Sequence, residues 1–144
     1  LESSDEVDCV CKAVISGIIC IYGRGGKWIG FQYNYNLTSS EGYTEVLAEQ
    51  GAEWRIGIRN GKVTFGGVET SRTTQISTVS GDLNYGGYGG NFYAWKGDLG
   101  RMTIKDSNGH LKIDLIPCEH NGKYGFCDIV SKTFLGEGKY VAVS

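Results

Sequence analysis

The feature that most constrains this chain is the stretch 97–143, in which short apolar runs alternate with turn residues. Apolar side chains recur at every second position in the runs 102–104 and 111–115, the spacing of strands with one buried face. Ser-Asn-Gly at 107–109 separates these runs, and Asn-Gly at 121–122 follows the second. Asn and Gly adopt positive φ readily, as tight hairpin turns require. The stretch therefore predicts a meander of antiparallel strands.

The rest of the chain has the same strand-and-turn rhythm. Trp54–Arg59 and Lys62–Phe65 flank Asn60-Gly61, which is the plainest hairpin signal in the sequence. In the first strand, Val7, Cys9 and Cys11 form one apolar face. Further strands are expected at 7–15, 18–22, 28–35 and 73–79, a polar loop at 36–43, and either a strand or a helical turn at 44–48. We therefore expect an all-β, two-sheet antiparallel sandwich.

The composition is that of a folded domain, and it argues against nucleic acid and membranes as partners. The chain has 144 residues, enough for one domain, with 23 Gly but also 9 Tyr, 5 Phe and 3 Trp, which argues against disorder. A net charge of -2 provides no basic field for nucleic acid. No apolar run reaches the ~20 residues of a membrane span, so membrane insertion is not expected.

The N-terminal residues are acidic. Glu2, Asp5, Glu6 and Asp8 would suit an exposed arm or linker end at 1–8, ahead of a single domain at 9–144. The single methionine is Met102, so we expect a processed chain or a piece of a longer protein.

The C-terminal third resembles a known signature. It consists of Lys112–Cys118, Gly125–Val130, Phe134, and Gly136 with Gly138. It is similar to the C-terminal pattern of concanavalin A-like (laminin-G-like) jelly-roll domains in phage appendage proteins and gut-bacterial surface proteins. Here Cys127 replaces the usual aromatic residue, and Gly-Glu-Gly replaces the usual Asn-x-Gly-x-Gly ending.

The resemblance implies a jelly-roll sandwich in which the signature supplies central strands. The side chains expected to be among the most buried are Leu115, Ile116, Phe126, Ile129 and Phe134.

Catalysis is not expected. Glycosidases of this class need two facing carboxylates, in the family as Glu-x-Asp-x-x-Glu or a close relative. The carboxylates considered for that role, Glu41, Glu45, Glu49 and Asp114, do not form this pattern. His110 and His120 lie in predicted hairpin turns, where a solvated histidine is the simplest explanation and no positioned base is evident.

The stretch 81–95 is the candidate ligand surface. It interleaves aromatic rings, which can stack on the C–H faces of sugars, with amides that can bind hydroxyl groups. Its glycines would let the backbone approach a ligand. The alternative is that its rings pack in the core or at an interface. The candidate binding residues are Tyr85, Tyr88, Trp95, Asn84 and Asn91.

No cofactor is expected. Calcium is the one metal considered, because Asp and Asn oxygens bind it in related folds, but roles in turns explain the same residues. The candidates by residue type are Asp82, Asn84, Asn91 and Asp98.

The five cysteines are expected to be mainly buried thiols. Cys118 and Cys127 flank the turn at 121–122; with Cys118 opposite Gly125, they are diagonal neighbours, which we take to be too far apart for a disulfide.

Together these features predict a non-catalytic binding or adhesion module that recognises a cell-surface or dietary glycan. We expect it on a phage appendage, as a tail fibre or head decoration, or on a bacterial surface, and hence outside the cell or on a virion. The alternative is a structural module that caps or oligomerises an appendage as a homo-oligomer or part of a larger assembly. A degenerate glycosidase-like domain is a third reading.

Overall fold

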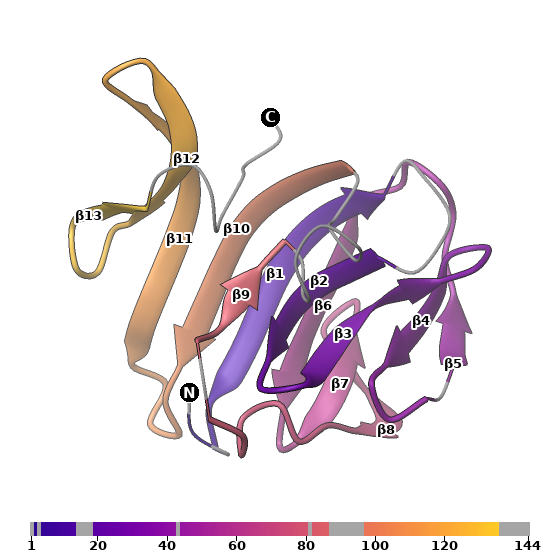
Figure 1. Ribbon diagram of the computed structural model, residues 1–144. Coiled ribbons are helices and arrows are strands. Elements are labelled where there is room, and N and C mark those ends of the chain that lie inside the picture. The colour runs from indigo at the N-terminus through magenta and orange to yellow at the C-terminus, as the bar shows by residue number, and fades with distance from the viewer. Residues whose placement is uncertain are drawn as a thin grey trace.

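The fold consists of two antiparallel sheets (Figure 1). The computed structural model describes residues 2, 4–13, 19–42, 44–80, 82–86 and 97–135, and within these ranges every regular element is a β-strand. The expected all-β class with two antiparallel sheets, a β-sandwich, is thus confirmed. These ranges contain no helix long and apolar enough to cross a bilayer.

Over the described residues, the larger sheet has eight strands and the smaller has five. In spatial order, the larger sheet is formed by β13 (Thr133–Leu135), β12 (Lys123–Asp128), β11 (Leu111–His120), β10 (Gly97–Lys105), β1 (Glu6–Ala13), β6 (Trp54–Arg59), β7 (Lys62–Phe65) and β8 (Val68–Thr73). The smaller sheet is formed by β5 (Thr44–Leu47), β4 (Asn36–Ser39), β3 (Lys27–Gln32), β2 (Ile19–Arg24) and β9 (Asn84–Tyr85).

The Asn-Gly turns close hairpins as the sequence predicts. Asn60 and Gly61 join β6 to β7 with φ of 54° and 70°, and Asn121 and Gly122 join β11 to β12 with φ of 50° and 77°. Both pairs therefore occupy the left-handed region that these turns require. Strands β10, β11 and β12 form the predicted meander.

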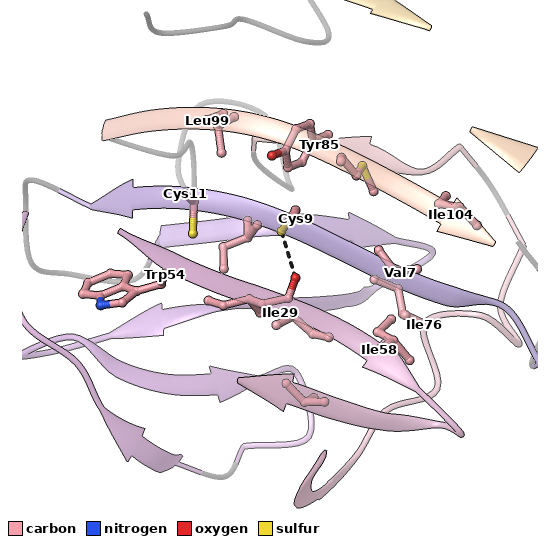
Figure 2. Close-up of a cluster of buried hydrophobic side chains, with 14 of the residues drawn as sticks. Val7, Cys9, Cys11, Ile29, Trp54, Ile58, Ile76, Tyr85, Leu99 and Ile104 are labelled. Atoms are coloured by element: carbon pink, nitrogen blue, oxygen red, sulfur yellow. Dashed lines mark hydrogen bonds between the residues drawn. The ribbon is translucent and has the colours of Figure 1, made fainter. Parts of the chain in front are cut away.

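The core lies between the sheets and is centred on β1. Val7, Cys9 and Cys11 are buried on one face of this strand, as their alternation predicts (Figure 2). The Cys9 thiol donates a hydrogen bond to the carbonyl of Ile56 on the neighbouring β6 at 3.2 Å. Burial raises the pKa of both the Cys9 and the Cys11 thiol, so both remain protonated and pack as small apolar groups.

The N-terminal arm expected at 1–8 is shorter than the sequence suggests. Strand β1 begins at Glu6, Val7 is buried, and Asp5 is only 2% exposed. The Asp5 carboxylate accepts a hydrogen bond from the Lys112 ammonium on β11 at 2.8 Å. The prediction is therefore wrong for residues 5–8, because alternate acidic side chains point outward from a strand whose other face is in the core.

Two predicted strand boundaries are also wrong. Residues 36–39 form β4 rather than a loop, and they bury Thr38 and Ser39 as well as Leu37. Strand β8 ends at Thr73, where the prediction placed the start of a strand. Beyond it the chain turns, and the Thr78 hydroxyl donates to the Gln75 carbonyl at 2.9 Å, a local bond that competes with strand pairing. The segment 44–47, left open by the sequence, is a strand.

The signature strands are not central, contrary to expectation. Phe126 and Leu115 are buried at 0% and 5% exposed, but Phe134 and Ile116 are half-buried and Ile129 is 49% exposed. Strands β11, β12 and β13 form one end of the larger sheet, and Figure 1 shows them to one side of the two-sheet body. Only their side chains nearest the smaller sheet can therefore be fully covered.

Cys118 and Cys127 form a disulfide, so the prediction of free thiols is wrong for this pair. The expected register is correct, because Cys118 lies opposite Gly125 and Cys127 opposite Ile116. Their Cα atoms are nevertheless only 5.9 Å apart, well within disulfide range. The right-handed twist of paired strands shortens one diagonal, which the argument from a flat sheet missed.

Candidate functional site

Tyr85 is a core residue rather than an exposed ring. It is 1% exposed, and its ring centroid lies 5.3 Å from that of Phe126 on the larger sheet. Its hydroxyl donates a hydrogen bond to the Gly100 carbonyl at 3.0 Å. A ring held in this way has no open face for a sugar. The prediction that Tyr85 stacks on a ligand is therefore corrected, because β9 directs this side chain between the sheets.

The other predicted ligand residues are placed only in part. Asn84 is half-buried and shares β9 with Tyr85. Tyr88, Asn91 and Trp95 lie outside the described residues, so their roles stay predictions. The structure thus brings two of the five predicted residues to one strand at the edge of the smaller sheet.

A hollow of about 220 Å³ lies beside this strand, between the chain at 82–85 and strands β10 to β13. We call it the inner hollow. Its wall is mainly aliphatic, with two carboxylates. It is lined by Asp82, Leu83, Tyr85, Met102, Ile104, Ile113, Leu115, Asp128 and Leu135.

The Asp128 carboxylate supplies a fixed negative charge to the inner hollow. It accepts hydrogen bonds from the backbone N–H groups of Asp114 and Val130 at 3.0 and 3.1 Å, and from the Ser131 hydroxyl at 2.8 Å. Burial raises the pKa of this carboxyl, but these hydrogen bonds outweigh burial and leave the pKa below its ordinary value. Asp128 is therefore ionised at neutral pH, which is the wrong state for a general acid.

The other carboxylates and histidines considered for catalysis lie elsewhere. Asp114 is buried and binds the Arg101 guanidinium through two hydrogen bonds of 2.7 and 2.6 Å. Glu41 accepts a hydrogen bond from the Gln75 backbone N–H at 3.3 Å. His110 and His120 are exposed. None of these residues lines the inner hollow.

The residues considered for calcium are not gathered at one place. Asp82 is exposed at the inner hollow, whereas Asp98 is half-buried on β10 and lines a different depression. Asn91 lies outside the described residues. Within the described ranges, no group of three or more His, Cys, Asp or Glu side chains is placed to hold a metal ion.

A second hollow, of about 330 Å³, lies on the opposite face of the larger sheet. We call it the outer hollow; it is lined by Asp8, Cys9, Val10, Arg101, Thr103, Lys105 and Leu111. Two of its charged groups already have partners. Asp8 pairs with Arg55 at 2.6 Å, and Arg101 with Asp114. Its described lining is more polar than that of the inner hollow, so it offers less apolar surface to the C–H faces of a sugar.

Sequence reasoning missed the inner hollow although it recognised much of its wall. Met102, Ile104, Ile113 and Leu115 are the alternating apolar residues of the predicted meander, and Leu115 is also one of the residues expected in the core. A local apolar pattern does not distinguish a side chain that lines a hollow from one that packs in a closed core, so the sequence carries no direct signal for it.

Comparisons with known proteins do not add an identity, since no family model, curated protein or solved structure matches the chain.

Proposed function

We propose that this protein is a non-catalytic glycan-binding and adhesion module on an exposed surface, either of a phage appendage or of a bacterial cell. Its fold is proposed to be a jelly roll of the concanavalin A-like type. The position of β1 between β6 and β10, and the return of the chain from β9 in the smaller sheet to β10 in the larger, support a jelly-roll path.

The observation that carries the proposal is the inner hollow. It adjoins the stretch from which sugar-binding residues were predicted, and it combines an apolar wall with the carboxylates of Asp82 and Asp128. Apolar surfaces match the C–H faces of a pyranose, and carboxylate oxygens accept hydrogen bonds from its hydroxyl groups. Tyr88, Asn91 and Trp95 remain candidates for contacts from the same stretch of chain.

Two further observations support a binding role outside the cell. The Asp128 carboxylate is held ionised by backbone donors, which suits a structural or binding group better than a proton donor. The disulfide between Cys118 and Cys127 favours an oxidising location, since such bonds are rare in the cytosol.

A glycan array followed by two matched variants tests the proposal. Leu83→Trp would fill the inner hollow and Thr103→Trp the outer hollow. With both variants shown to be folded by thermal melting, we expect a selective glycan signal that Leu83→Trp abolishes and Thr103→Trp retains. An array with no selective signal contradicts glycan binding. A signal lost only in Thr103→Trp would move the site to the outer hollow.

A structural role in an assembly is the second candidate function. Four of the large apolar side chains that the structure exposes in its described part lie on or beside β11 and β12. They are Leu111, Tyr124, Ile129 and Val130, from 40% to 58% exposed. Light scattering would detect an oligomer, and the double change Ile129→Ser with Val130→Ser should dissociate it if these side chains form the interface.

A further inference from the structure

A β-bulge on β10 contributes to the outer hollow. The register of β10 against β1 shifts between Cys9 and Cys11, so that Val10 alone faces both Gly100 and Arg101. A bulge re-aims a side chain relative to the regular alternation of its strand, and bulges are frequent beside binding and active sites. Here it places the Arg101 side chain, which is 57% exposed, at a hollow of about 330 Å³. That volume lies within the range of roughly 300–1,000 Å³ typical of ligand sites.

Three hydrogen-bond donors follow one face of β10 at the outer hollow. The Arg101 guanidinium donates through Nε and Nη2 to the Asp114 carboxylate at 2.7 and 2.6 Å, which fixes its orientation and leaves Nη1 as a further donor. Thr103 and Lys105 follow at alternate positions and line the same hollow. Within the described part of the chain, neither of these two side chains has a hydrogen-bond or ion-pair partner.

The carboxylates beside these donors are paired with other cations. Asp8 lines the outer hollow and contacts the Arg55 guanidinium at 2.6 Å. Glu6 lies opposite Lys105 in the strand register, but its carboxylate is 3.8 Å from the Arg59 guanidinium. The Lys105 ammonium therefore contributes a positive charge that neither of these carboxylates neutralises by contact.

From these donors and this charge we infer that the outer hollow binds an oxyanion, namely the sulfate or phosphate ester group of a larger ligand. Such an ester presents three terminal oxygens, one for each donor, whereas a carboxylate presents two. The long side chains of Arg101 and Lys105 flank the short one of Thr103 on the strand, so their donors can converge on one group. Hydrogen bonds from cations to such oxygens are charge-assisted and favour this group over a neutral one. The inference does not depend on glycan binding at the inner hollow.

Titrations with four small sugars test the chemistry of this site. The probes are glucose 6-sulfate, glucose 6-phosphate, glucuronic acid and glucose, added to ¹⁵N-labelled protein at low ionic strength. We expect one or both esters to shift the amide signals of Arg101, Thr103 and Lys105 to saturation, and the ester that binds more tightly identifies the group. Glucuronic acid should bind about twofold or more weakly, and glucose should not saturate. Raising the ionic strength to about 0.5 M should weaken binding of the ester, because exposed charges are then strongly screened.

Three variants with a matched control test the assigned residues. Lys105→Gln and Thr103→Val each remove one donor, and each should weaken binding of the ester by about two- to fivefold. Thr103→Trp fills the hollow and should abolish the response. Lys62→Gln is the control, because Lys62 is an exposed lysine of the same sheet that does not line this hollow, and it should leave the affinity unchanged. Arg101 is kept, since its loss would leave the buried Asp114 carboxylate without its cation.

Several outcomes would overturn the inference. One is the absence of a saturable shift with both esters, and another is equal binding of the esters and glucuronic acid or glucose. Equal weakening by Lys62→Gln and Lys105→Gln would show a diffuse attraction to surface charge instead of a site. An undiminished response in Thr103→Trp would place the bound ester elsewhere on the protein. None of these outcomes decides whether the inner hollow binds a glycan.

Discussion

Tyr85 and Gly100 connect the two sheets through one hydrogen bond, from the Tyr85 hydroxyl to the Gly100 carbonyl at 3.0 Å. Tyr85 belongs to β9 of the smaller sheet and Gly100 to β10 of the larger. The ring packs on Phe126, so a single side chain combines an apolar contact with a polar link across the core. This position explains why the ring cannot serve as a sugar platform.

Removing that hydroxyl should destabilise the protein without opening a large cavity. We expect Tyr85→Phe to lower the free energy of unfolding by about 1 kcal/mol, the usual contribution of one buried hydrogen bond. Urea denaturation measures the change. Tyr33→Phe is the matched control, because Tyr33 is 61% exposed, and it should stay within about 0.5 kcal/mol of the unmodified protein. Equal effects at both positions would contradict the proposed link.

The disulfide should contribute measurably to stability. It joins residues nine apart in sequence, and closing a loop of this size in the unfolded chain corresponds to about 2–3 kcal/mol. We expect the midpoint of urea denaturation to fall when Cys118 and Cys127 are both changed to Ser. Reductant should lower the midpoint of the unmodified protein and leave that of the double variant unchanged. Peptide mapping that finds Cys118 unlinked to Cys127 would contradict the pairing.

Stability should fall in acid partly through Asp128. The folded-state pKa of this carboxyl lies below its ordinary value of 3.8, so its stabilising contribution is present above that value and is lost as the pH falls through the folded-state pKa. Asp128→Asn should therefore cost about 2–3 kcal/mol at about pH 7 and less at about pH 3, which lies below the ordinary value and where part of the stabilising contribution of the carboxylate is lost. Urea titrations at the two pH values measure this. If Asp128→Asn lowers the free energy of unfolding equally at both pH values, the charge of the Asp128 carboxylate does not contribute to stability.

Gly57 should resist substitution more than any flexible turn glycine. It lies on β6 between two neighbouring strands, and a Cβ there would overlap the backbone carbonyl of Val7 on β1. Backbone would have to move, so Gly57→Ala should cost about 3 kcal/mol or more. Gly100→Ala is the control, because its Cβ would lie 3.3 Å from Val10, a contact that small shifts relieve. Its expected cost is below about 1 kcal/mol by thermal or urea denaturation.

Phe126 and Phe134 should differ strongly although both belong to the same signature. Phe126 is fully buried, so Phe126→Ala should cost about 3–5 kcal/mol. Phe134 is half-buried on β13 at the end of the sheet, and Phe134→Ala should cost less than half as much. If urea denaturation gives similar losses of stability for the two variants, the Phe134 side chain on β13 is more deeply buried than the structure shows.

The sequence predicts well those elements that are specified by residues adjacent in the chain. Asn60-Gly61 and Asn121-Gly122 specify their turns by backbone conformation alone, and the alternation beside them specifies which face is buried. Strand β4 was missed because it buries Thr38 and Ser39, so its polar residues do not alternate with apolar ones as a half-buried strand usually does.

The remaining errors concern relations between distant parts of the chain. Whether Ile129 is buried depends on how far the smaller sheet extends, and whether Cys118 reaches Cys127 depends on strand twist. Tyr85 was assigned to a ligand surface because its neighbours in sequence are Gly, Asn and aromatic residues. Its burial follows from Phe126 and Gly100, which contact it from the other sheet. A local sequence pattern reports neither the extent and twist of a sheet nor the contacts that a side chain receives from the other sheet.

The place of β1 has a consequence for how the chain is made. It is synthesised before both of its neighbours, because β6 lies at 54–59 and β10 at 97–105. During translation one edge of β1 stays unpaired until about two-thirds of these residues have been added. The most central strand is thus among the last to be enclosed, and the nascent protein depends on avoiding foreign strand pairing until β10 arrives.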